Sequence, residues 1–80
     1  MVKIFDIVKH EHTISCSYTP EDTELKGTVE VDVNTQEIKK VNYSKYEYGK
    51  KMYVAQVCKK ISELLDSNLP LPKEAIAIWY

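Results

Sequence analysis

Lysines and tyrosines crowd one stretch of this chain, and they are the residues whose types and spacing come closest to a binding chemistry. Residues 38–60 contain seven lysines and one acidic residue, whereas residues 1–37 contain three lysines and eight acidic residues. Such a concentration of one charge is typical of an interaction surface. The candidate binding residues are Lys39, Lys40, Lys45, Tyr46, Lys50, Lys51, Lys59 and Lys60.

Three interpretations compete for this stretch. Lysines can neutralise phosphates while Tyr43, Tyr46, Tyr48 and Tyr53 stack on bases, which would make a nucleic-acid surface. Alternatively, the lysines contact an acidic protein partner. The third interpretation is structural, with lysines in water and tyrosines padding the border between a sheet and a helix. The structural interpretation is preferred for most of the stretch. The chain lacks arginine and its pI is only about 6.1, so of the two binding interpretations a protein partner is preferred to nucleic acid.

Other candidate ligands and nucleophiles are few. His10, His12 and Cys16 would share one face of an uninterrupted strand, but they supply only three zinc ligands and a polar break separates them. Cys58 falls on the apolar stripe of a predicted helix, where cysteine usually fills the core, and a disulfide with Cys16 is conceivable only if that helix lies on the strand. No phosphate-binding loop or hydrolase motif is present. We therefore expect no metal, no cofactor and no catalytic residue.

Alternating side chains predict four strands in the first half of the chain. We expect them at residues 2–9, 13–19, from 25 or 27 to 33, and 38–43. The first strand has apolar residues on both alternations, which indicates either a strand covered on both faces or a bulged strand. The last two form a hairpin whose period slips near Lys39 and Lys40, so a bulge is expected there.

A single amphipathic helix follows these strands. Ser44 and Glu47 fit the S-x-x-E capping box, and Gly49 is a competing start, so we expect a well-formed helix from about residue 49 or 50. Apolar residues then recur at three- and four-residue spacing from Val54 to Leu65. Asn68 is a credible residue for the left-handed position that follows a helix.

The last seven residues, 74–80, are apolar on both alternations and predict a strand inserted into the sheet, with Trp79 in the core. The alternative is an edge strand that pairs with another chain, including a second copy.

These elements predict one domain, residues 1–80, of the α+β class. It should contain one mainly antiparallel sheet of about five strands, in the order β-β-β-β-α-β, with a single amphipathic helix packed on one face. No apolar run approaches the roughly 18 residues of a membrane-spanning helix, so we expect no membrane contact and a cytoplasmic location with reduced thiols. The expected function is that of a small non-enzymatic accessory or regulatory protein acting through protein contacts, as a monomer or weak homodimer. Nucleic-acid binding by residues 39–60 is the alternative.

Overall fold

The computed structural model describes residues 1–47 and 51–78, which form a five-stranded antiparallel sheet with one α-helix packed against it. The elements are β1 (Val2–His10), β2 (Thr13–Pro20), β3 (Gly27–Asp32), β4 (Ile38–Asn42), the 3-10 helix η1 (Lys45–Glu47), α1 (Met52–Asp66) and β5 (Ala75–Ala77). The strands lie in the order β4-β3-β2-β1-β5. The predicted α+β architecture is confirmed.

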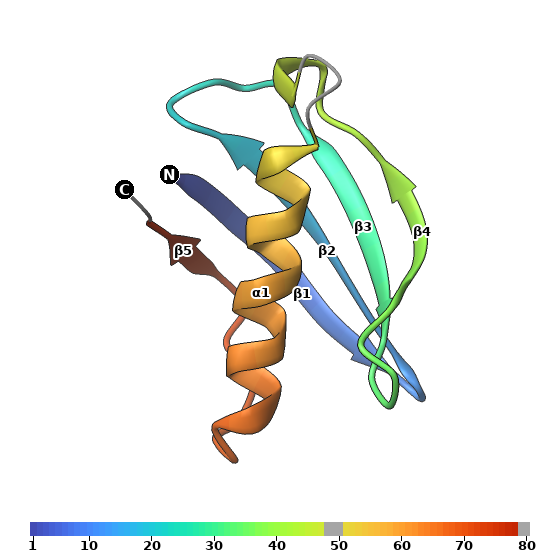
Figure 1. Ribbon diagram of the computed structural model, residues 1–80. Helices are drawn as coiled ribbons and strands as arrows, with labels where there is room; N and C mark the ends of the chain where they lie inside the picture. Colours follow the sequence, from blue (N-terminus) through green and yellow to red (C-terminus); the bar gives the residue numbers. More distant parts are fainter. Residues whose placement is uncertain (48–50, 79–80) are drawn as a thin grey trace.

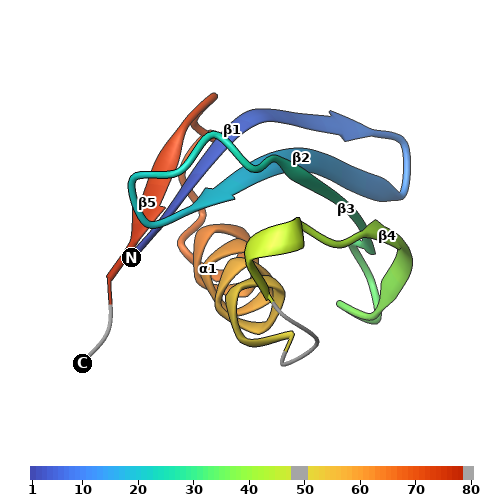
Figure 2. The same cartoon turned by 90° about the horizontal axis from the view of Figure 1, so that it is seen from above.

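The helix α1 covers one face of the sheet and leaves the opposite face uncovered. Figure 1 shows α1 crossing one side of the strands, and Figure 2 shows the sheet curving around it from β5 to β4. The core lies between these two layers, where Val2, Ile4, Ile14, Val57 and Ile61 are almost fully buried. The face opposite α1 is covered by no other described element, and we call it the open face.

A bulge in β1 explains the apolar residues on both of its alternations. Asp6 has φ 52°, and the pairing with β2 shifts register between Phe5 and Val8. The extra residue turns Ile7 into the core beside Ile4, while Val8 is exposed on the other side. The bulged-strand alternative is therefore the correct one.

The boundaries of α1 differ from the prediction at one end only. The helix begins at Met52, and the proposed capping-box segment lies outside it, because Lys45–Glu47 form the separate helix η1. Gly49 lies outside the described residues. At the other end the helix stops at Asp66, and Asn68 adopts the predicted left-handed conformation with φ 59°.

The prediction that the last strand is inserted into the sheet is wrong. β5 lies at an edge and pairs only with β1, opposite Val2 to Ile4. Both faces of β5 carry apolar side chains, but only one of them is buried. Ala77 packs in the core, whereas Ile76 on the other face is 51% exposed. Trp79, which we expected in the core, lies outside the described residues.

Candidate binding surface

A buried carboxylate holds the segment between β4 and α1 in place. Glu47 is 4% exposed, and its Oε1 accepts hydrogen bonds from the backbone N–H groups of Tyr53 (2.8 Å) and Val54 (3.2 Å). Its other oxygen accepts a hydrogen bond from the Tyr18 hydroxyl on β2. The first N–H groups of a helix have no partner within it and favour a negative charge. Glu47 therefore caps α1 from a distance.

The predicted capping box is replaced by a different set of bonds. Ser44 Oγ accepts the Tyr46 N–H (3.1 Å) and donates to the Leu25 carbonyl, while the Ser44 N–H donates to Tyr18 Oη (3.0 Å). Gly27 permits this close approach, because a Cβ there would lie 2.5 Å from the Tyr18 ring and 2.7 Å from the Ser44 nitrogen. The network ties β2, β3 and η1 together.

The Tyr18 hydroxyl remains protonated in this network. Burial, followed by the hydrogen bond to Glu47, raises the pKa of Tyr18 above its ordinary value. A protonated phenol donates to the carboxylate and accepts the Ser44 N–H, so both neighbours are satisfied.

Exposed lysines gather where β4, η1 and α1 meet. Lys45 and Lys51 are exposed, and so are the neighbouring Tyr43 and Met52. The Lys51 ammonium lies 5.4 Å from the centroid of the Tyr43 ring, within the range of a cation–π contact. We call these four residues the basic end.

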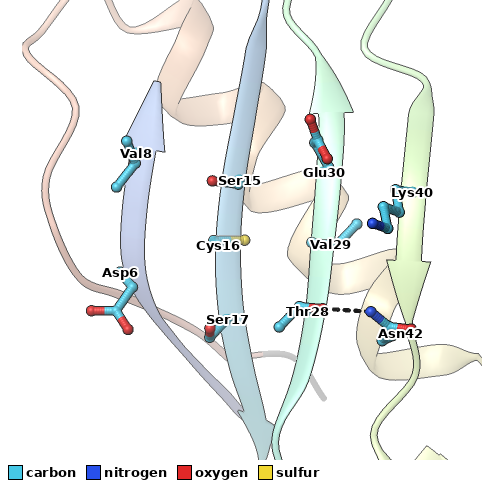
Figure 3. A pocket seen from close by; sticks show the side chains of 10 residues that line it. All are labelled: Asp6, Val8, Ser15, Cys16, Ser17, Thr28, Val29, Glu30, Lys40 and Asn42. Carbon is cyan, nitrogen blue, oxygen red and sulfur yellow. Dashed lines mark hydrogen bonds between the residues drawn. The ribbon is translucent and has the colours of Figure 1, made fainter. Parts of the chain in front are cut away.

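One of the two lysines of β4, Lys39, lies in a bulge. Lys40 pairs with Glu30 and Ile38 pairs with Val31, so Lys39 is the extra residue, which confirms the predicted bulge. Lys40 projects from the open face, as Figure 3 shows. It therefore lies on the opposite side of the sheet from α1.

The lysines of α1 lie further along the helix. Lys59 is exposed, whereas Lys60 is half-buried and forms an ion pair with Glu63 (3.9 Å). Lys50 lies outside the described residues. The predicted binding residues that the structure describes consequently do not form one patch. Lys45 and Lys51 belong to the basic end, and Tyr46 lies in η1. Lys39 and Lys40 lie on β4, and Lys59 and Lys60 lie along α1.

Two of the tyrosines, Tyr46 and Tyr53, pack at the border between the sheet and the helix. Tyr53 is buried and its hydroxyl donates to Glu21 (2.7 Å), and the half-buried Tyr46 packs edge-on against it with ring centroids 5.6 Å apart. The Tyr43 ring carries the Lys51 ammonium, and Tyr48 lies outside the described residues. The packing of Tyr46 and Tyr53 agrees with the structural interpretation, whereas Tyr43 is exposed.

The open face contains two shallow hollows that the sequence did not indicate. Small side chains at Ser15 and Ser17 on β2 leave a hollow of about 420 Å³, shown in Figure 3 between larger neighbours on β1, β3 and β4. A second hollow of about 580 Å³ lies beside Phe5 and Ile76. The sequence shows the alternating hydroxyls of β2, but it does not show which strands lie on either side of β2.

The potential metal ligands and nucleophiles are dispersed. Cys16 is buried on the covered face, where burial and then the neighbouring Cys58 thiol raise its pKa to about 12. Burial also raises the pKa of Cys58, and both thiols are free. His10 and His12 are exposed at the end of β1 and in the turn after it. In the described ranges, no three His, Cys, Asp or Glu residues are grouped to hold a metal ion.

No protein-family model, no curated protein sequence and no solved structure matches this chain. Within residues 1–47 and 51–78, no helix has the length and apolar character needed to cross a membrane.

Proposed function

We propose that this chain is a small, non-enzymatic, cytoplasmic binding protein whose basic end contacts an acidic segment of a partner protein. One observation carries the proposal. Glu47 is the only acidic residue between residues 38 and 60, and it is buried against the N-terminus of α1. The exposed charge of this segment therefore comes from lysines alone.

The surroundings of the basic end suit a protein partner better than a nucleic acid. Stacking on bases needs accessible aromatic faces, but Tyr53 is buried and Tyr46 packs on it. The exposed Tyr43 ring already lies under the Lys51 ammonium. The open face is also a poor nucleic-acid surface, because Glu30 pairs with Lys40 across β3 and β4, and Asp6 adds a second carboxylate across the hollow on β1. Tyr43 and Met52 add apolar contact area to the basic end, which a protein segment can use.

We expect binding at the basic end to be weak and to depend on the salt concentration. Exposed lysine–carboxylate pairs contribute about 0–1 kcal/mol each and are screened by ions. Two pairs, at Lys45 and Lys51, are therefore worth about tenfold in affinity. Raised thiol pKa values also fit a protein that performs no nucleophilic chemistry, because the reactive thiolate is scarce at neutral pH.

The test is a titration with poly-L-glutamate and, separately, with single-stranded polyuridylate, at low and high salt. The double variant Lys45→Glu/Lys51→Glu removes the basic end. The variant Lys9→Glu/Lys73→Glu has the same net charge. Lys9 lies beside Leu64 and Leu65 near the other end of α1, and the Lys73 carbonyl accepts a hydrogen bond from the Ile7 N–H in the bulge of β1 (3.1 Å).

We expect the wild type to bind poly-L-glutamate, and the affinity to fall with salt. Reversal at the basic end should weaken it about tenfold more than the charge-matched control does. Equal losses in both variants, no binding at low salt, or tighter binding to polyuridylate would each contradict the proposal.

A further inference from the structure

The two edge strands of the sheet, β4 and β5, are protected to different degrees against pairing with another chain. The β4 edge carries two lysines, Lys39 and Lys40, and a bulge, which are devices that discourage pairing with another chain. The β5 edge pairs with β1 without a register shift, and neither β5 nor Ile78 after it carries a charge or a proline. Ile76 is 51% exposed and Ile78 is 62% exposed. Of the two edges, β5 is the one open to pairing.

The hydrogen bonds between β1 and β2 show which residues of β5 turn their backbone N–H and C=O groups away from the sheet. The Met1 carbonyl accepts a hydrogen bond from the N–H of Glu21 beyond β2 (2.8 Å). Backbone groups alternate sides along an antiparallel strand, so Val2 and Ile4 turn theirs toward β5. Their partners are the two end residues of β5. The middle residue, Ile76, therefore turns its N–H and C=O away from β1.

We propose that β5 pairs antiparallel with β5 of a second copy, on a two-fold axis that passes beside Ile76. The outward N–H of Ile76 in each copy then donates to the Ile76 carbonyl of the other copy. In this register Ile78 of each copy lies opposite Glu74 of the other. The two sheets become one continuous sheet with both helices on the same side.

A second copy fits this edge because the edge is self-complementary. The residue with outward backbone groups is the middle one of β5, so one register satisfies both copies and the contact closes on itself. The alternative pairing of β5 with β4 of another copy meets the lysines and the bulge. Repulsion is small, since each copy has a net charge of only −1.

The hollow beside Phe5 and Ile76 borders this axis on the open face. Pairing places the Ile76 side chains of both copies next to each other at its rim, which removes exposed apolar surface from water. The strand is short, so the interface is small and the dimer should be weak and concentration-dependent.

The test is the molecular mass by sedimentation velocity over a hundredfold range of protein concentration. The variant Ile76→Pro removes the outward N–H without breaking a bond to β1, so we expect it to keep the monomer fold. Ile76→Lys places two like charges beside the axis. The matched control is Ile38→Lys, which changes an isoleucine of similar exposure, 43%, on the β4 edge.

We expect the wild type and Ile38→Lys to dimerise as the concentration rises, and both Ile76 variants to remain monomeric with native circular dichroism. Should Ile76→Pro fail to fold, Ile76→Lys alone decides. A wild type that stays monomeric throughout the range overturns the proposal. A dimer that survives both folded Ile76 variants, or that Ile38→Lys alone abolishes, overturns it as well.

Discussion

One carboxylate, Glu47, caps α1 and also removes a negative charge from the surface proposed for binding. Its two carboxylate oxygens accept three hydrogen bonds. One comes from the Tyr18 hydroxyl on β2, and two come from the N–H groups of Tyr53 and Val54 in α1. A buried donor that loses its acceptor costs the free energy of its lost hydration. The residue therefore links the stability of the fold to the charge of the basic end.

Replacing Glu47 by alanine should lower the free energy of unfolding by about 3 kcal/mol, because three buried donors lose their acceptor. Urea denaturation measures this change. The control is Glu63→Ala on the exposed side of α1, where the ion pair with Lys60 is solvated and a change of about 0.5 kcal/mol or less is expected. Similar losses in the two variants would contradict the capping role of Glu47.

Glu21 should make the fold sensitive to acid. The hydrogen bond from Tyr53, followed by that from the Met1 ammonium group, lowers the pKa of the Glu21 carboxyl. A lowered folded-state pKa stabilises the protein above the ordinary glutamate pKa of about 4.3, and this contribution is lost as the pH falls through the lowered value.

The melting temperatures of the wild type and Glu21→Gln should therefore differ at neutral pH and converge in acid. Thermal unfolding by circular dichroism at a series of pH values measures the difference. A gap between the two proteins that stays constant from neutral pH into acid would show that the charge of Glu21 plays no part.

At the scale of elements, the bulge in β1 decides which side chains reach the core. Asp6 occupies the left-handed region with φ 52°, which aspartate tolerates and β-branched residues do not. We expect Asp6→Val to lower the free energy of unfolding by about 1–2 kcal/mol and Asp6→Gly to leave it unchanged or raise it. Denaturation of both variants checks this, and equal stability of the two would contradict the assigned backbone strain.

Local patterns predicted most of the elements. Alternation located β1 to β4, the slip near Lys39 located a bulge, and Asn68 marked the end of α1. These features depend on neighbouring residues, so the sequence displays them directly.

The two errors involve contacts between distant segments. The spacing of Ser44 and Glu47 fits a capping box, but the Glu47 carboxylate instead accepts hydrogen bonds from the N-terminus of α1 and from Tyr18. Tyr18 and Gly27, which make room for this arrangement, are far from Glu47 in sequence. The place of β5 depends on where α1 crosses the sheet, and the apolar pattern of a short edge strand resembles that of a buried one. Neither relation is local.

At the scale of the whole molecule, the sheet separates two surfaces that the sequence presented as one basic stretch. Lys40 projects from the open face beside Glu30, whereas Lys59 and Lys60 lie along α1 on the other side. Among the described residues, the basic end contains two of the predicted lysines, Lys45 and Lys51, and two exposed side chains with apolar surface, Tyr43 and Met52. The fold thus narrows the candidate surface to one end of the molecule.

The most direct measurement is a map of backbone amide shifts in ¹H–¹⁵N spectra as poly-L-glutamate is added at low salt. The account predicts that the largest shift changes fall on the basic end and disappear when salt is raised. Changes centred on Lys9 and Lys73, changes spread over the open face, or no changes at all would contradict it.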